Sequence, residues 1–146
     1  MVSNSANKSK KRRVRNSHNL YLGVDGGGTN TQVILLNEEN HFVAEGFAGA
    51  SNPLRVGVET AVSNIVKAAE AACDAANRSR GDMVSAALGL AGVRREDLRA
   101  RVRESFFQRL RINPIVVTTD AEIALYGVTL GKAGLVVIAG TGSVCM

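Results

Sequence analysis

Apolar and polar residues alternate along the first part of the chain, with the period of two that is typical of β-strands. Three such segments follow one another, separated by short polar or glycine-rich turns: LYLGVD at 20–25, TQVILLN at 31–37 and FVAEGFA at 42–48. Strands joined by short turns pair antiparallel. Residues 20–48 therefore predict an antiparallel meander of three strands.

The spacing of apolar residues changes to three and four after residue 56, which is the period of an α-helix. This pattern predicts an amphipathic helix over residues 56–77, ended by the polar segment NRSRGD at 77–82. The small thiol of Cys73 lies on the apolar face, which predicts a buried side chain. The apolar positions are Val58, Val62, Ile65, Val66, Ala69, Ala72, Cys73 and Ala76.

Strands and helices alternate in the remainder of the chain. Apolar segments at 83–92, 113–120 and 134–143 predict strands, and the segments around 98–106 and at 121–131 predict helices. Alternation of this kind favours parallel strands joined by crossover helices. The whole pattern predicts an α/β fold with a mixed sheet that begins as a meander.

Length and composition favour one compact domain. The chain has 146 residues, of which 45% are hydrophobic and 21% charged, and this is enough to build a core. It contains no apolar segment as long as a membrane span and no apolar stretch of a secretory signal near its start. Two cysteines provide neither a disulfide framework nor a paired metal site. We therefore expect a cytoplasmic protein without a membrane partner.

The net charge of +5 is concentrated at the start of the chain. Residues 1–19 contain six of the 18 Lys and Arg residues and none of the 13 Asp and Glu residues, so the rest is close to neutral. The segment KSKKRRVR at 8–15 has too few apolar residues to pack. We interpret residues 1–19 as a disordered basic tail in preference to a nucleic-acid or sorting signal.

A glycine-rich turn separates the first two strands, in the segment VDGGGTNT at 24–31. It does not open a helix, as the G-x-G-x-x-G dinucleotide fingerprint requires, because the strand-like TQVILL follows. The P-loop pattern also fails: in YGVTLGKA, Tyr126 replaces the first glycine and Ala133 the final hydroxyl residue. The segment instead predicts a hairpin with exposed backbone amides at its tip.

Such a tip is suited to phosphate groups. Glycine allows a positive φ and the close approach of an anion, so that successive amides converge on phosphate oxygens. The carboxylate of Asp25 would repel a phosphate unless a cation lay between them, which implies Mg²⁺ bound through water. The alternative is a tight hairpin in which the glycines serve geometry alone. A second glycine-rich turn, AGTGS at 139–143, favours the first interpretation, because two such hairpins can hold a polyphosphate from both sides.

The ordered set of motifs resembles the actin-like ATPase superfamily, and within it the BadF/BadG/BcrA/BcrD ATPase family with its N-acetylglucosamine kinases. The motifs are DGGGTNT at 25–31, SNP at 51–53, LGLAGV at 88–93, TTDAEIAL at 118–125 and AGTGS at 139–143. The resemblance implies a ribonuclease H-like lobe that uses ATP and Mg²⁺, with a sugar as the small-molecule substrate.

The resemblance also implies a role for each matching residue. Asp25 would support the Mg²⁺ ion, and Asp120 would be the catalytic base and a sugar ligand. Asn52 and Gly92 would lie on the sugar side. The residues implied to contact the ATP phosphates are Gly26, Gly27, Gly28 and Thr29 in the first turn and Gly140, Thr141, Gly142 and Ser143 in the second.

Three of these residues also have a structural alternative. A carboxylate at the end of a parallel strand suits Asp120 to accept the proton of a sugar hydroxyl, but it could also cap the following helix. The amide of Asn52 can donate to one hydroxyl and accept from another, whereas Asn-Pro also starts turns. Gly92 could let a ligand approach the backbone or simply end its strand.

We expect three parts along the chain: the tail over 1–19, an N-terminal ATPase lobe over 20–132, and the first strand and phosphate turn of a second lobe over 133–146. Superfamily members hold ATP between two lobes, so we expect the isolated chain to have little or no kinase activity. The strand GLVVIAG at 134–140 would lack partner strands, which invites edge pairing with a second copy or a missing C-terminal lobe.

The leading hypothesis is the N-terminal part of an ATP-dependent kinase for N-acetylglucosamine or a related amino sugar. One alternative is an activator ATPase of acyl-CoA dehydratases or reductases, although Cys73 and Cys145 are poorly placed to hold the cluster that such an activator needs. Another alternative is a non-catalytic, sugar-sensing regulator whose tail contacts nucleic acid. We rank this last, because no helix-turn-helix pattern accompanies the tail, and expect no nucleic-acid partner.

Overall fold

The computed structural model describes residues 19–130, 132–133, 137–139 and 143–145. Nearly all of the predicted basic tail lies outside these residues, as do Gly140, Thr141 and Gly142 of the second glycine-rich turn. For Ser143 only the backbone is described. The first glycine-rich turn and Asp120 lie within the described residues.

A five-stranded mixed sheet forms the centre of the molecule. Its strands are β1 (Leu20–Gly26), β2 (Asn30–Leu36), β3 (Phe42–Gly49), β4 (Met83–Leu90) and β5 (Ile115–Thr119), in the order β3-β2-β1-β4-β5. The predicted meander is confirmed, because β1 pairs antiparallel with β2 and β2 with β3. β4 pairs parallel with both β1 and β5, as the alternation of strands and helices predicts.

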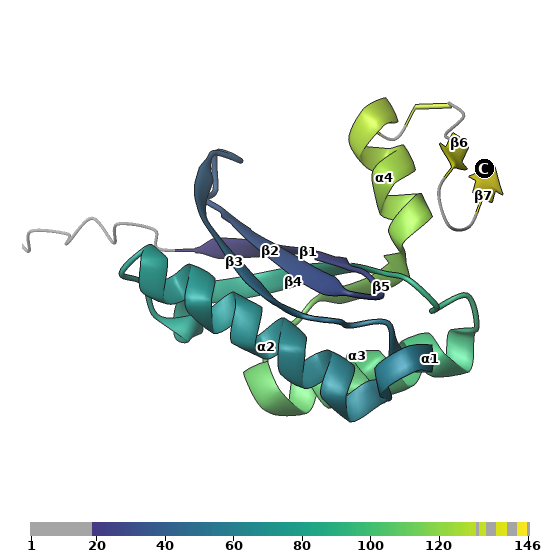
Figure 1. The fold of residues 1–146 in the computed structure, drawn as a ribbon. Coiled ribbons are helices and arrows are strands. Elements are labelled where there is room, and N and C mark those ends of the chain that lie inside the picture. The colour runs from purple at the N-terminus through teal and green to yellow at the C-terminus, as the bar shows by residue number, and fades with distance from the viewer. Residues whose placement is uncertain (1–18, 131, 134–136, 140–142, 146) are drawn as a thin grey trace, which may run out of the picture.

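Helices cover the two faces of this sheet unequally. They are α1 (Pro53–Val56), α2 (Val58–Ala75), the 3₁₀-helix η1 (Arg80–Asp82), α3 (Glu96–Leu110) and α4 (Asp120–Thr129). α2 and α3 lie on one face, and α4 rises from the other face at the ends of β4 and β5 (Figure 1). One face of the sheet is thus packed along its length, and the other is covered at one end.

Two features differ from the sequence-based prediction. Gly57 has a φ of 80°, which is outside helical geometry, so the helix predicted over 56–77 begins only at Val58 as α2, and a separate short helix, α1, precedes it. Beyond α4, β6 (Val137–Ala139) pairs antiparallel with β7 (Ser143–Cys145). The prediction that the strand at 134–140 has no partner is therefore wrong, because a hairpin within the chain provides one.

Small side chains bring α2 close to the sheet. Alanines form most of its buried face, and Cys73 is buried among them, as predicted. A Cβ added to Gly46 of β3 would lie 2.1 Å from the carbonyl oxygen of Ala68. Helix and strand therefore pack backbone to backbone at this point.

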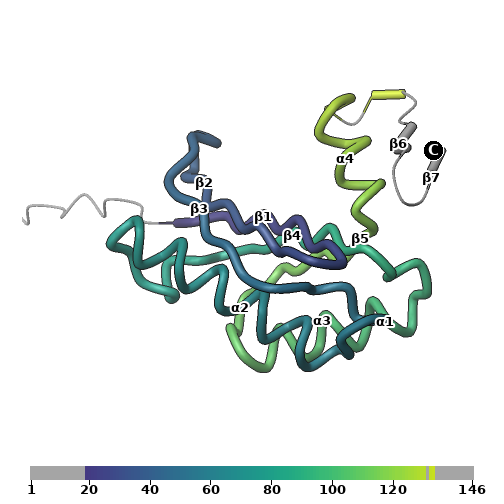
Figure 2. Tube along the Cα trace, in the orientation of Figure 1, coloured from purple at the N-terminus to yellow at the C-terminus, as the bar shows by residue number. Residues whose placement is uncertain are grey.

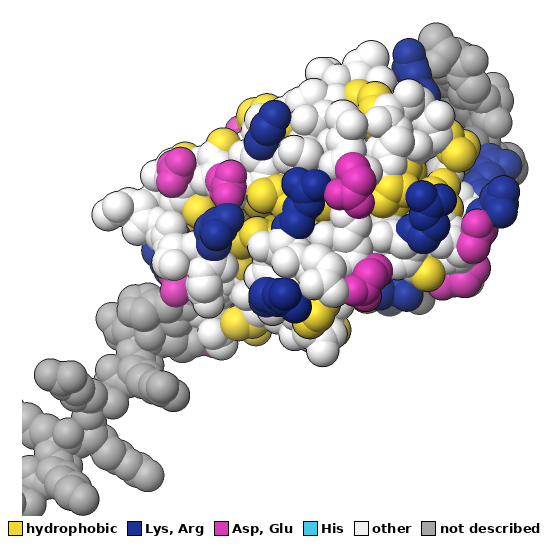
Figure 3. All heavy atoms as spheres, turned by 90° about the horizontal axis from the view of Figure 1, so that it is seen from below, with side chains coloured by type: hydrophobic (Ala, Val, Ile, Leu, Met, Phe, Trp, Pro, Cys, Tyr) yellow, Lys and Arg dark blue, Asp and Glu magenta, His cyan; other side chains and the backbone are white. Residues whose placement is uncertain are grey.

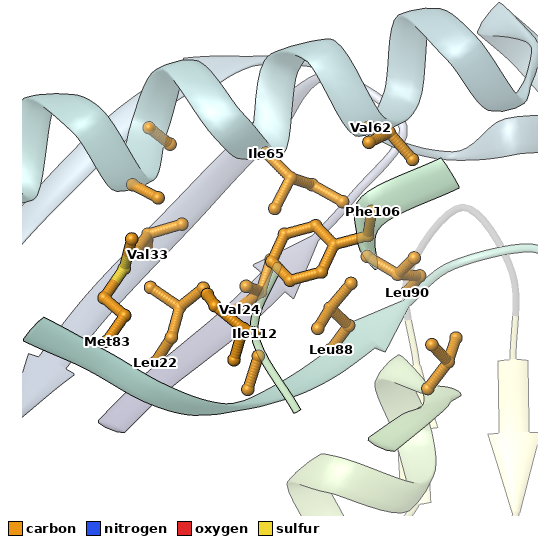
Figure 4. Packing of buried hydrophobic residues seen from close by; sticks show 14 of the residues in the cluster. Leu22, Val24, Val33, Val62, Ile65, Met83, Leu88, Leu90, Phe106 and Ile112 are labelled. Carbon is orange, nitrogen blue, oxygen red and sulfur yellow. The ribbon is translucent and has the colours of Figure 1, made fainter. Parts of the chain in front are cut away.

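Large apolar side chains fill the space between the sheet and α3. Phe106 is fully buried and points among Ile65, Leu88 and Leu90 (Figure 4). These four residues come from α3, α2 and β4, so one aromatic ring joins both helices to the sheet.

The helix-covered side of the molecule carries side chains of both charges, interspersed over its surface (Figure 3). No large region of one sign is visible on this face. Among the described residues, none of the helices combines the length and apolar character needed to cross a bilayer.

Candidate functional site

Three parallel strands end at the same edge of the sheet. Gly26 of β1 is paired with Leu90 of β4, and Leu90 with Thr119 of β5, so the last residues of these strands form one row. Neighbouring strands lie about 4.8 Å apart, so the row spans about 10 Å. The glycine-rich turn, the turn with Gly92 and the helix that begins at Asp120 all start from this row, where α4 leaves the sheet (Figure 2).

Backbone hydrogen bonds fix the neighbouring loops to the glycine-rich turn. The amide of Ala91 donates to the carbonyl of Gly26 at 2.8 Å. The carbonyl of Gly27 accepts from the amides of Ser51 and Asn52 at 3.0 and 3.1 Å. The segment after β3 and the segment after β4 therefore meet at the base of one hairpin.

The first glycine of the turn is required by space. A Cβ on Gly26 would lie 2.3 Å from both the Leu90 side chain and the Ser51 hydroxyl oxygen. The glycines of this turn do not use the positive φ that glycine allows, because Gly57 and Gly92 are the glycines with positive φ in the described part of the chain. Gly26 is buried within β1, so it has a packing role whatever it contacts in a complex.

The tip of the turn presents backbone amides to solvent. The amide of Gly27 donates to the carbonyl of Asn30 at 2.8 Å, whereas the amides of Gly28 and Thr29 have no partner among the described residues. Nη1 of Arg55, on α1, donates to the carbonyl of Gly28 at 3.2 Å. The tip is thus held from one side, and two amides remain for a ligand. Sequence reasoning did not identify Arg55.

Asp25 lies beside this tip. It is exposed on the sheet face opposite α2 and α3, and it lines an open hollow of about 520 Å³ together with Gly27, Thr29 and Gln32. Its carboxylate has no hydrogen-bond or ion-pair partner among the described residues. Within the same residues, no three His, Cys, Asp or Glu side chains are grouped to hold a metal. A cation at Asp25 would therefore keep much of its water, as Mg²⁺ commonly does in proteins.

Asn52 and Gly92 lie against one another. Oδ1 of Asn52 accepts the amide of Leu54 at 3.0 Å and so caps α1, as an Asn-Pro turn residue would. A Cβ on Gly92, whose φ is 84°, would lie 2.4 Å from that oxygen. Nδ2 of Asn52 has no partner among the described residues. The structural role of Asn52 therefore uses its oxygen and leaves its two N–H groups free.

The cap of α4 is Thr119, and Asp120 is the first residue inside the helix. The Thr119 hydroxyl accepts the amide of Glu122 at 3.1 Å, and the Glu122 carboxylate accepts the amide of Thr119 at 2.8 Å. The alternative in which Asp120 caps the helix is therefore wrong, because Thr119 is the N-cap residue and forms a reciprocal capping box with Glu122. Within the described residues, the Asp120 side chain accepts one hydrogen bond, from the amide of Ala121 at 2.9 Å.

Glu122 is held by a cluster of donors that sequence reasoning missed. The hydroxyl of Thr118, both donors of Thr119 and Nη2 of Arg99 all reach Oε2 of Glu122. The hydrogen bond from Thr118 leads the causes that lower the pKa of the Glu122 carboxyl, so this group is ionised at neutral pH. The T-x-x-E spacing is a capping-box signature that could have identified Glu122. Arg99 leaves no such signal, because it meets Glu122 only in the folded chain.

A second hollow, of about 850 Å³, lies between the start of α2 and α3, away from the row of strand ends. Two of its charged side chains, Glu59 and Arg109, pair with one another. Glu59 accepts from Arg109 and from Ser105, each at 2.8 Å. The carboxylate of Glu59 is thus already engaged by protein donors, unlike that of Asp25 at the strand ends.

The site at the strand ends combines two kinds of chemistry. Free amides and an exposed carboxylate with no protein partner lie at the end of β1, and a carboxylate with one backbone contact lies at the end of β5. Asn52 adds free amide donors between them. This arrangement is suited to holding a polyphosphate at one end and accepting a proton at the other.

Comparison with known proteins gives consistent matches. Residues 22–146 match the BadF/BadG/BcrA/BcrD ATPase family. The glucosamine kinase GspK of Vibrio cholerae is 36% identical over 126 residues, which cover 86% of this chain and 42% of that protein. An N-acetylmuramic acid/N-acetylglucosamine kinase of Clostridium acetobutylicum is 27% identical over 124 residues, covering 85% of this chain and 40% of that protein.

A solved structure also matches the fold. A Chromobacterium violaceum protein assigned as an N-acetylglucosamine kinase superposes with a TM-score of 0.77 at 28% identity, covering 88% of this chain and 45% of that protein. The mixed sheet with crossover helices is thus the ribonuclease H-like lobe that the sequence predicts. The chain spans about two fifths of the length of the curated relatives that it matches.

Proposed function

The chain belongs to the BadF/BadG/BcrA/BcrD ATPase family, and from this we propose that it forms one lobe of an ATP-dependent sugar kinase. We propose an amino sugar, such as N-acetylglucosamine or glucosamine, as the phosphate acceptor. One observation carries the proposal: the ends of β1, β4 and β5 form a single row from which the glycine-rich turn, Gly92 and Asp120 all start.

The phosphate end of the site is the first hairpin. The free amides of Gly28 and Thr29 would donate to phosphate oxygens, and Asp25 would hold a hydrated Mg²⁺ ion beside them. When bound, Mg²⁺ would neutralise phosphate charge. Gly26 and Gly27 shape this hairpin. With Gly28 and Thr29 they make up the phosphate-binding residues that we propose for the first turn.

The second phosphate turn belongs to the proposal on the strength of the family resemblance. Gly140, Thr141 and Gly142 lie outside the described residues, and only the backbone of Ser143 lies within them. We propose that this turn approaches the phosphates from the second lobe, of which residues 133–146 would be the start.

The acceptor end of the site is Asp120. A sugar hydroxyl becomes a better nucleophile when a carboxylate accepts its proton as the phosphoryl group is transferred, while positioning and charge neutralisation supply most of the rate. Because Asp120 caps no helix and has one backbone contact, its carboxylate is available for this proton. Asn52 would donate to a second hydroxyl through Nδ2, and Gly92 would allow the sugar to approach the backbone.

The surroundings of Cys73 argue against the alternative of an activator ATPase with a cysteine-held cluster. Cys73 is 2% exposed on the buried face of α2. Burial also raises the pKa of its thiol, which disfavours the thiolate that metal binding requires. Cys73 is therefore unavailable as a ligand at the surface.

The test is an assay of the whole gene product with ATP, Mg²⁺ and a panel of glucosamine, N-acetylglucosamine, N-acetylmuramic acid and glucose. We expect turnover with at least one amino sugar. The Asp120→Asn variant should lower kcat by about 10²- to 10⁴-fold, because it keeps the size of the side chain and removes the proton acceptor.

The matched control is Asp97→Asn, which removes an exposed carboxylate on α3 that pairs with Arg95. This variant should keep kcat within about twofold of the parent protein. Turnover of Asp120→Asn at the rate of this control would contradict the assignment of the base. Absence of turnover on every sugar by the parent protein would contradict the kinase itself. We expect the 146-residue chain alone to show little or no activity.

A further inference from the structure

The start of α4 is bound to the end of β5 through one carboxylate. Oε2 of Glu122 accepts the amide of Thr119 at 2.8 Å and its hydroxyl at 3.0 Å, and it also accepts the hydroxyl of Thr118. These donors all belong to the last two residues of β5. The first turn of α4, which carries Asp120, is therefore anchored to the sheet by Glu122.

Arg99 extends this anchor to a third element. Its Nη2 donates to Oε2 of Glu122 at 3.2 Å, and its Nε donates to the carbonyl of Val93 at 2.7 Å. The side chain of Arg99 is 20% exposed and that of Glu122 is 39% exposed, so the pair is partly shielded from solvent. One guanidinium from α3 thus joins the loop after β4 to the start of α4.

Arg99 binds the Val93 carbonyl and the Glu122 carboxylate, and each of these lies close in sequence to a residue proposed to contact the sugar. Val93 directly follows Gly92, which lies against Asn52, and Glu122 lies two residues after Asp120. We infer that Arg99 is a positioning residue, which acts through Glu122 and Val93 to fix the Asp120 carboxylate relative to the Asn52 and Gly92 turn. This inference rests on the proposed kinase function.

The geometry of Asp120 explains why such a tie matters. Its side chain has one hydrogen bond among the described residues, to the adjacent amide of Ala121, so the backbone of the first helical turn sets its position. Displacing a catalytic group by about 1 Å can reduce a rate by about 100-fold. A displacement of α4 relative to the loop after β4 would act directly on the distance between the base and the sugar.

The first experiment compares Arg99→Met with Arg95→Met in the whole gene product. Both arginines lie at the start of α3. Arg95 pairs with the exposed Asp97, which is outside the site, whereas Arg99 pairs with Glu122. We expect Arg99→Met to lower kcat about 10- to 100-fold, with KM for ATP and for the sugar within about twofold of the parent. The control should keep both constants. Thermal unfolding of each variant establishes that it is folded at the assay temperature.

A double-mutant cycle then tests the route through Glu122. Glu122→Gln keeps an acceptor for the capping box and removes the charge that faces Arg99, so we expect a smaller loss of kcat. The combination with Arg99→Met should be no slower than Arg99→Met alone, because both act on one link. Arg99→Lys should recover part of the rate, because one ammonium keeps the charge but not both hydrogen bonds of the guanidinium.

The outcomes separate this inference from the proposed function. An active parent whose Arg99→Met variant has the kcat of Arg95→Met overturns the positioning role and leaves the kinase intact. Additive losses in the double-mutant cycle overturn the route through Glu122. If Arg99→Met does not fold, Arg99→Lys and Glu122→Gln still decide: parental kcat in both overturns the inference, and reduced kcat with unchanged KM supports it. An inactive parent contradicts the proposed function itself.

Discussion

The side chain of Asn52 occupies the space that a side chain at position 92, just after β4, would need. The Cβ that any other residue would place at position 92 falls 2.4 Å from Oδ1 of Asn52, and the φ of 84° disfavours a side chain in any case. Two independent restrictions thus act on one position. The sequence left two explanations for a glycine at this position: it ends a strand, or it admits a ligand. The structure adds a third, because Gly92 is in contact with Asn52, the residue proposed to bind the sugar.

Three glycine-to-alanine variants can separate these restrictions. Gly57→Ala meets backbone strain alone, because its φ is 80° with a ψ of 158° and nothing lies within 4 Å of the added Cβ, and should destabilise by about 1–3 kcal/mol. Gly92→Ala adds the clash with Asn52 and should destabilise more. Gly127→Ala, in α4 with no neighbour and no positive φ, should be neutral or stabilise by up to about 1 kcal/mol.

The measurement is chemical unfolding of the three variants beside the parent protein. A Gly92→Ala variant that is no less stable than Gly57→Ala would show that the Asn52 side chain moves aside without cost. In the sugar assay, Gly92→Ala should also raise KM for the sugar, because displacing Asn52 moves its free N–H donors.

At the scale of the element, the start of α4 depends on an ionised carboxylate. Hydrogen bonds from the Thr118 hydroxyl and the Thr119 amide and hydroxyl, together with the charge of Arg99, lower the pKa of Glu122 below its ordinary value of 4.5. A group whose pKa is lower in the folded state stabilises fully above its unfolded value. That stabilisation is lost as the pH falls through the folded value.

Glu122→Gln should therefore reduce the melting temperature at pH 7 and have a smaller effect near pH 3. Below the unfolded-state pKa the unfolded chain takes up a proton that the folded carboxylate resists, so the contribution of the carboxylate falls with pH and the two proteins differ less. Glu59 and Asp97, whose pKa values are also lowered by hydrogen bonds, are present in both proteins and cancel in the comparison. A difference in melting temperature that is independent of pH would assign the effect to packing alone.

At the scale of the whole molecule, Phe106 joins the two covering helices to the sheet. It is fully buried among Ile65, Leu88 and Leu90, while the adjacent Phe107 is half-buried and lies 5.4 Å below the guanidinium of Arg111. These two consecutive residues of α3 differ in burial. The same substitution at both positions therefore compares the stability that a buried ring contributes with that of a partly exposed one.

Phe106→Ala should lower the free energy of unfolding by about 3–5 kcal/mol, because it leaves a cavity between α2, α3 and β4. Phe107→Ala removes a partly solvated ring and one cation–π contact, so its loss should be smaller. Urea unfolding of both variants tests this, and equal losses would contradict the central place of Phe106 in the core.

Local patterns in the sequence determined most of the fold. Period-two alternation before residue 49 predicts the meander, and three-to-four spacing predicts the covering helices, because burial of one face needs only that spacing. The alternation of apolar strand segments with helices predicts the parallel strands. The motifs at 25–31, 51–53, 88–93 and 118–125 also identified the family to which the chain belongs. The sequence also shows that the glycine-rich turn, Gly92 and Asp120 each lie at the end of a predicted strand.

Tertiary structure alone decided how these residues meet. The row of Gly26, Leu90 and Thr119 depends on the register of three strands that are distant in sequence, and register is set by side-chain packing across the sheet. The link from Arg99 to Glu122 joins α3 to α4 and has no counterpart in the spacing of residues along the chain. Sequence predicts periods and turns because they are local, whereas these contacts exist only after the chain has brought separate elements together.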